Sequence, residues 1–169
     1  MFRSPCQFRS APAARVRGQR QCGTRWRGRL VVEQMSITLP DSSIAWKTSQ
    51  TRDLTSDVPT PLFYDGDFFV LSDVRKKLSR VNPSSGQIKW TVDMPGSRKF
   101  ESSPTGADGK IYCMNFAGDV TVVDAAKGQV LGTIAMGEEG DDMTRSEVAV
   151  AGGQLFIRTN HKLFCIAGK

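Results

Sequence analysis

The sequence lacks any long apolar segment. No run approaches the ~20 apolar residues that a membrane-spanning helix needs. The N-terminus also lacks the apolar stretch of roughly 7 to 15 residues that forms the core of a secretion signal. The chain therefore gives no indication of a membrane span or of its compartment, so its localisation stays undetermined.

Acidic residues are missing from the first 29 positions, which contain eight arginines. These arginines account for the formal charge of +6, and the rest of the chain carries about −2. We therefore expect no nucleic-acid partner. The arginine-rich start fits either an organelle transit peptide or out-of-frame translation, and its lack of periodicity favours the second. Residues 1–40 are predicted to be a basic tail that is disordered or mistranslated.

Cysteine is scarce, and its spacing matches no metal or redox motif. The four cysteines contain neither a CxxC pair nor two adjacent residues: Cys6, Cys22, Cys113 and Cys165. Cys113 and Cys165 each lie in an apolar run typical of a strand, where a free buried thiol is the usual outcome. We expect both to be buried and expect no disulfide between them.

The sequence offers few other groups for chemistry. The acidic run Glu138, Glu139, Asp141 and Asp142 lacks the alternating pattern of a calcium loop, so we expect a solvated surface connection. His161, the single histidine, falls in a predicted turn without a partner for acid–base work. We predict no catalytic, cofactor-binding or metal-binding residue.

An internal repeat is the main feature that is present. Three segments align: PLFYDGDFFVLS from Pro61, PTGADGKIYCMN from Pro104 and VAVAGGQLFIRT from Val148. Their turn glycines lie 43 and 44 residues apart, and a second set of apolar runs follows at spacings of 42 and 43. Such a period indicates a repeat architecture.

Each repeat reads as four short strands. The pairs Asp65-Gly66, Asp108-Gly109 and Gly152-Gly153 separate apolar runs, and such pairs favour two-residue hairpin turns with positive φ. A polar break, a third strand, a turn such as the one at residues 82–86, and a fourth strand follow. Turn geometry alone explains Asp65 and Asp108, so neither is a catalytic candidate.

Four antiparallel strands in every 40 to 45 residues are the pattern of propeller blades. A β-sandwich is the main alternative, but it does not require turn glycines and tryptophans at a constant offset. We predict an all-β fold, a partial β-propeller over residues 41–169. One blade ends at Trp46, two blades span about 58–96 and 101–137, and a partial blade spans 146–169.

The segments ESSPTGADGKIYCMNFAGDVTVVDAAKGQV and NPSSGQIKW resemble repeats of the pyrroloquinoline-quinone-type propeller family. The resemblance covers about residues 40–169. It implies that a turn of the form Asp-x-x-x-Gly-x-x-x-Trp docks the tryptophan on a neighbouring blade. Asn82, Gly86 and Trp90 match these places, and Trp46 matches more loosely. Asp124 and Gly128 match too, but Gly132 replaces the tryptophan, so a weaker blade contact is expected there.

The resemblance also bears on function. Rings of this family commonly have seven or eight blades, whereas this chain holds two complete repeats, so we expect a truncated product whose partner is another protein or the missing blades. The favoured function is a non-enzymatic scaffold or protein-interaction module without a cofactor, resembling propellers that organise envelope assembly and are often exported. The alternative is the remnant of an oxidoreductase that binds pyrroloquinoline quinone with calcium.

Overall fold

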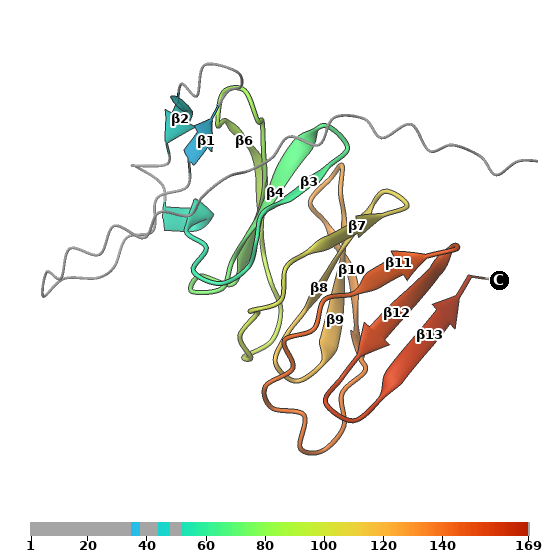
Figure 1. The fold of residues 1–169 in the computed structure, drawn as a ribbon. Helices are drawn as coiled ribbons and strands as arrows, with labels where there is room; N and C mark the ends of the chain where they lie inside the picture. The colour runs from blue at the N-terminus through green and yellow to red at the C-terminus, as the bar shows by residue number, and fades with distance from the viewer. Residues whose placement is uncertain (1–34, 38–43, 48–51, 169) are drawn as a thin grey trace, which may run out of the picture.

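The structure, a computed structural model, describes residues 35–37, 44–47 and 52–168 (Figure 1). Most of the predicted basic tail, including Cys6 and Cys22, lies outside the described residues. One strand, β1 (Met35–Ile37), falls inside the segment assigned to the tail and pairs antiparallel with β2 (Ile44–Lys47). The described strands thus begin before residue 41.

The described chain consists of antiparallel sheets that follow one another along the sequence (Figure 1). A 3₁₀ turn, η1 (Arg52–Leu54), precedes the first four-stranded sheet. That sheet, blade A, contains β3 (Leu62–Tyr64), β4 (Asp67–Ser72), β5 (Lys77–Val81) and β6 (Ile88–Asp93). Blade B contains β7 (Thr105–Ala107), β8 (Lys110–Met114), β9 (Asp119–Asp124) and β10 (Val130–Ala135). Blade C contains β11 (Ala149–Ala151), β12 (Gln154–Arg158) and β13 (Leu163–Ala167).

In every blade the strands lie side by side in chain order, each antiparallel to the next. The predicted all-β class and the four-strand repeat are therefore confirmed in blades A and B.

The first hairpin of each blade turns on the predicted dipeptide. Asp65 and Gly66 have φ of 50° and 77°, and Asp108 and Gly109 have 49° and 68°. Two successive positive φ values match the right-handed twist of the flanking strands. The dipeptide Gly152-Gly153, with φ of 56° and 74°, makes the corresponding turn of blade C.

The turn between the third and fourth strands is fixed by a side chain. The carboxamide oxygen of Asn82 accepts hydrogen bonds from the backbone amides of Ser84 and Ser85, at 2.9 and 3.1 Å. Asp124 holds blade B's turn in the same way, which is the local bonding that favours Asn and Asp in turns. Gly86 and Gly128 close these turns with positive φ.

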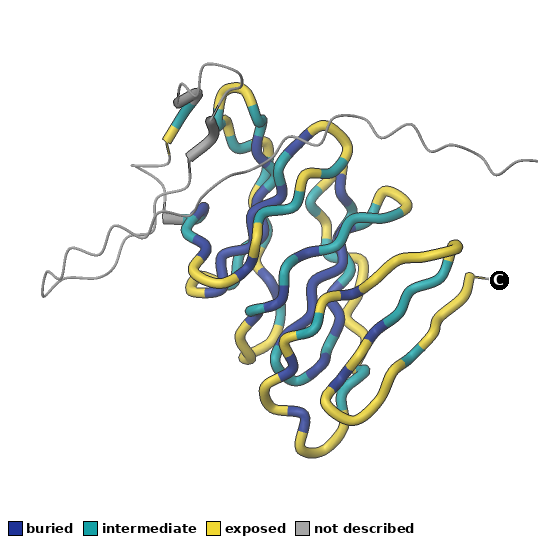
Figure 2. The backbone as a smooth tube through the Cα atoms, viewed as in Figure 1, coloured by how far each residue is buried: buried dark blue, intermediate teal, exposed yellow. Residues whose placement is uncertain are grey.

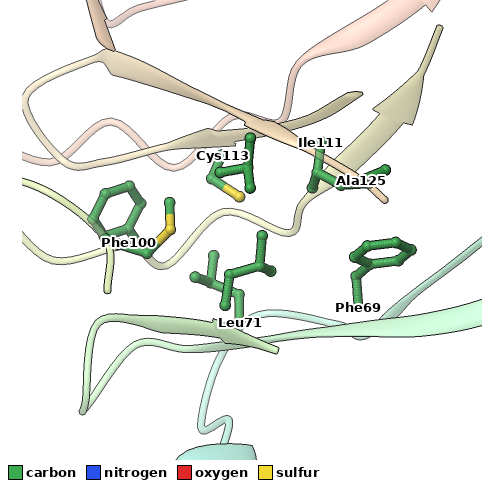
Figure 3. Packing of buried hydrophobic residues seen from close by; sticks show 9 residues of the cluster. Phe69, Leu71, Phe100, Ile111, Cys113 and Ala125 are labelled. Carbon is green, nitrogen blue, oxygen red and sulfur yellow. The ribbon is translucent and has the colours of Figure 1, made fainter. Parts of the chain in front are cut away.

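The blades pack face to face through alternating side chains. Phe69, Leu71 and Leu78 of blade A meet Ile111, Cys113 and Val123 of blade B in one buried cluster (Figure 3). Because successive side chains of a strand point to opposite faces, the residues between them line the next interface. Tyr112, Met114 and Val120 of blade B accordingly pack with Val148 and Ile157 of blade C's segment.

Burial falls off towards the C-terminal end of this stack (Figure 2). The β4 strand of blade A is buried at five of its six positions, whereas β13 has one half-buried residue and four exposed ones. Blade C is therefore covered on one face, and its other face is open in the described chain.

Candidate functional site

Two tryptophans join consecutive blades at the turn glycines. The ring of Trp46 lies so close to Gly86 that a Cβ there would sit 2.7 Å from it, and Trp90 lies equally close to Gly128, at 2.6 Å. The Trp46 indole N–H also donates to the Pro83 carbonyl at 2.7 Å. Glycine has no Cβ, so it is the residue for which the tryptophan ring leaves room.

Trp90 differs from Trp46 in its hydrogen bonding. Its indole N–H is buried and has no hydrogen-bond partner. The carbonyl of Ala125, 42 residues after Pro83, accepts instead from the Arg80 guanidinium at 2.9 Å. Gly132, where the repeat loses its tryptophan, has nothing within 4 Å of its Cβ position, so no side chain fills that place in blade B.

A buried charge cluster crosses blade A and reaches blade B. The Asp67 carboxylate receives Arg80 Nε at 2.5 Å and Lys89 Nζ at 2.7 Å, and its side chain is only 4% exposed. Burial raises the pKa of Asp67, but the hydrogen bonds and charges of Lys89 and Arg80 outweigh it and hold the pKa below its ordinary value. Arg80 also lies over the Phe69 ring, 5.5 Å from its centroid.

The open face of blade C carries residues at the same repeat positions that blade B uses to contact blade C. Phe156, Leu163 and Cys165 stand 43 or 44 residues after Tyr112, Val120 and Val122, which in blade B pack against blade C. Cross-strand pairing places Phe156 beside Cys165 on this face. Leu163 is 69% exposed. We refer to Phe156, Leu163 and Cys165 as the open blade face.

Cys165 corrects a sequence-based expectation. Both thiols were expected to be buried; Cys113 is, but Cys165 is exposed, and both are free. Cys113 lies between blades A and B, where burial raises the pKa of its thiol to about 12. Cys165 faces outward because no described blade covers its side of β13.

The acidic connection between blades B and C is also more ordered than expected. Asp141 is buried and accepts the backbone amides of Glu138 and Asn160, at 2.7 and 3.0 Å. The amide of Glu138 is the largest cause that lowers the pKa of Asp141. Asp141 is thus a structural residue that ties the connection to the turn of blade C, whereas Glu139 and Asp142 are exposed as predicted.

A pocket of about 270 Å³ opens at the end of blade A that carries the β4–β5 turn. It lies between two successive inter-blade connections. Its lining combines carboxylates, lysines and two valines: Asp57, Val58, Asp73, Val74, Lys76, Ser97, Lys99 and Glu101. This volume is just below the usual range of about 300 to 1,000 Å³ for ligand pockets.

The alternative function requires side chains that hold a quinone and calcium. No three His, Cys, Asp or Glu side chains gather as metal ligands within the described part of the chain. Cys113 and Cys165 lie on different blades. His161 is exposed in the turn of blade C, as the repeat predicts. Two of the buried carboxylates already have partners. Asp67 pairs with Arg80 and Lys89, and Asp141 accepts hydrogen bonds from backbone amides.

Sequence reasoning missed the charge cluster and the pocket. A signal for the cluster was present, because Asp67 stands where the other repeats have Lys110 and Gln154. Likewise Arg80 replaces an apolar residue of the interface, equivalent to Val122. A residue on a blade face that differs in type from its equivalents in the other repeats is thus the sequence signal for this cluster.

Comparisons with known proteins agree with the blade architecture. The family described as outer membrane protein assembly factor BamB matches residues 27–168. No curated protein sequence is a significant match. In the part that the structure describes, no helix has the length and apolarity to cross a membrane.

Solved structures share the fold at low sequence identity. BamB from Moraxella catarrhalis is 14% identical with a TM-score of 0.50, and the match covers 68% of this chain and 33% of that one. The computationally designed Ika4 protein is 12% identical with a TM-score of 0.59, covering 75% and 74%. Quinohemoprotein alcohol dehydrogenase from Comamonas testosteroni is 20% identical with a TM-score of 0.50, covering 61% and 17%. The chain spans about a third of the length of the BamB structure.

Proposed function

Since the chain belongs to the family described as outer membrane protein assembly factor BamB, with its propeller repeats, we propose that it is a non-enzymatic propeller module that binds protein. The same fold occurs in proteins whose names denote assembly and in others whose names denote dehydrogenation, so fold alone does not decide between them. The decision has to come from the residues of this chain.

The observation that carries the proposal is the open blade face. Its three central residues occupy the positions that blade B uses to hold blade C. A further blade of the same repeat type is the occupant that fits, because the next face of such a blade presents apolar residues at the places of Ile111, Cys113 and Val123. Exposed apolar surface of this kind marks an interaction site.

The partner's blade continues a stacking geometry that the chain already uses twice. Along each strand, the residues that enter one interface alternate with residues that point to the opposite face. Arg158 is the one charged residue of β12 and β13, and it occupies the position of Met114 in blade B. The open blade face is thus an apolar centre with a charge at its edge, the usual anatomy of a protein interface.

Self-association of the isolated chain tests this surface. Substituting Leu163→Asp places a charge at the centre of the open blade face and is expected to weaken self-association at least about tenfold. Sedimentation velocity over a range of protein concentrations measures it. The matched control is Met143→Asp, because Met143 is similarly exposed at 54% but lies on the connection between blades. A Leu163→Asp variant that associates as the wild type does contradicts the proposal.

The oxidoreductase alternative has its own test. Isothermal titration of the chain with pyrroloquinoline quinone and calcium is expected to give no saturable heat. Dye-linked oxidation of alcohols or sugars after the same reconstitution is expected to stay at the rate of the cofactor alone. Saturable binding or protein-dependent turnover would establish the alternative in place of the non-enzymatic module.

A further inference from the structure

The pocket at the end of blade A has a counterpart at the junction of blades B and C, where side chains of the chain itself fill the equivalent space. There Phe116, which stands 43 residues after Asp73, lies under the Arg145 guanidinium, 5.6 Å from its ring centroid. Arg145 also pairs with Glu101 at 3.1 Å. The Phe116 backbone bonds the connections on both sides, to Lys99 and Thr144. An arginine thus sits over the turn between two inter-blade connections in the chain itself.

At the equivalent place in blade A, the aromatic ring and the arginine are absent, and carboxylates occupy their positions. Asp73 replaces the aromatic ring, and Glu101, 44 residues before Arg145, replaces the arginine. The first junction therefore presents carboxylates where the second presents an aromatic ring and a guanidinium. The space left is the pocket of about 270 Å³.

Asp73 is the residue of the pocket with unused bonding capacity. It is 8% exposed, and its Oδ1 accepts the Asp57 amide at 3.0 Å. No described residue forms an ion pair with Asp73 or with Asp57. A carboxylate has several acceptor sites, so Asp73 retains room for a bidentate donor.

The other charged residues of the lining leave this place open. Lys76 donates to the Gly96 carbonyl at 3.0 Å, and Glu101 is paired with Arg145. Lys99 is exposed, and a lysine ammonium on a flexible stem can remain in water. The carboxylates of Asp57 and Asp73 are therefore the charges that meet an incoming group.

The rim of the pocket is apolar. Val58 and Val74 are 48% and 66% exposed and come from different loops. Apolar walls above a carboxylate suit a side chain with an aliphatic stem and a planar cationic head. Arginine has this form, and its guanidinium matches a carboxylate in bidentate geometry.

We propose that this pocket receives an arginine side chain from a segment of a protein partner. The inference rests on the proposed function, because it names a second contact for a protein-binding module. The guanidinium pairs with Asp73 at the base, and the methylene groups lie between Val58 and Val74. This contact lies on blade A at the loops, apart from the open blade face on blade C.

The probe is the blocked tripeptide acetyl-Gly-Arg-Gly-amide, titrated into the ¹⁵N-labelled full chain. Amide shifts are expected to saturate and to cluster at residues 57–58, 73–76 and 96–101. The same peptide with citrulline, which keeps the shape and loses the charge, is expected to bind at least about tenfold more weakly. Absence of saturable shifts up to about 20 mM peptide, or equal binding of citrulline, overturns the proposal.

Two variants locate the contact. Asp73→Asn keeps an acceptor for the Asp57 amide and is expected to weaken binding about tenfold. The matched control Asp142→Asn removes an exposed carboxylate from another connection and is expected to leave binding unchanged. Val74→Ser, at an exposed rim position that does not disturb the core, is expected to weaken binding about threefold. Unchanged binding in Asp73→Asn contradicts the proposal, because the guanidinium is assigned to that carboxylate.

The two proposals fail separately. Leu163→Asp is expected to leave the peptide shifts at residues 57–101 unchanged, and Asp73→Asn is expected to leave self-association unchanged. Loss of peptide binding with intact self-association overturns the arginine pocket alone. Peptide-induced shifts that centre on β12 and β13 overturn it as well, because the peptide then binds at the open blade face.

Discussion

Replacing Gly128 by alanine is expected to destabilise the chain by about 3 kcal/mol or more, because two costs add at this position. The backbone has φ of +68°, which costs a residue with a Cβ roughly 1 kcal/mol. The new Cβ would also sit 2.6 Å from the Trp90 ring, so the ring has to leave its place between blades A and B. Urea unfolding followed by circular dichroism measures the change.

Gly109→Ala is the matched control for this substitution. Gly109 has the same φ of +68°, but nothing lies within 4 Å of its Cβ position. Its expected cost is the backbone cost of about 1 kcal/mol alone. Equal destabilisation by the two substitutions would show that the tryptophan contact contributes nothing, contrary to its proposed part in joining the blades.

Replacing Asp67 by asparagine is expected to cost about 3 kcal/mol near neutral pH. The substitution removes the buried carboxylate that pairs with Arg80, whose side chain is 12% exposed, and leaves it only the exposed Asp65 carboxylate at 3.3 Å. It also weakens the orientation of the guanidinium that reaches the Ala125 carbonyl of blade B. The unfolding free energy from urea titration measures the loss.

The pH dependence of stability gives the sign of this interaction. Because the pKa of Asp67 is lowered in the folded chain, its contribution is fully present above the unfolded value of about 4 and is lost as the pH falls through the folded pKa. The Asp67→Asn variant is therefore expected to lose less stability than the wild type below about pH 4.

Asp93→Asn serves as the control for the charge cluster. Asp93 pairs with Lys77 at 3.1 Å but is 82% exposed, so its loss is expected to cost less than about 0.5 kcal/mol. If the unfolding free energies of the wild type and the Asp67→Asn variant fall equally as the pH is lowered, the assigned role of Asp67 is contradicted.

The sequence was sufficient for the parts of the fold that local chemistry determines. The hairpins at Asp65-Gly66 and Asp108-Gly109 follow from residues that tolerate positive φ, and the turns after Val81 and Val123 follow from Asn and Asp side chains. The spacing of these turns then determined the number of strands in each repeat.

Features that depend on the neighbouring element were not predictable in this way. Cys113 and Cys165 occupy similar apolar runs, yet one is buried and the other exposed, because burial depends on whether another blade lies opposite. Asp141 looked like part of a solvated acidic run, but its carboxylate binds an amide 19 residues later in the chain. The pocket at Asp73 required the arrangement of two connections and a turn, which no single segment contains.

Thiol labelling of Cys165, resolved by peptide mass spectrometry, tests the proposed function most directly. Cys165 is exposed at the open blade face, whereas Cys113 is buried and its thiol has a pKa of about 12, so it serves as the internal reference. In dilute solution we expect Cys165 to react readily and Cys113 to stay unmodified. At concentrations where the chain associates, we expect labelling of Cys165 to slow in proportion to the associated fraction, and Leu163→Asp to restore it. Undiminished labelling of Cys165 in the associated chain would contradict docking through the open blade face.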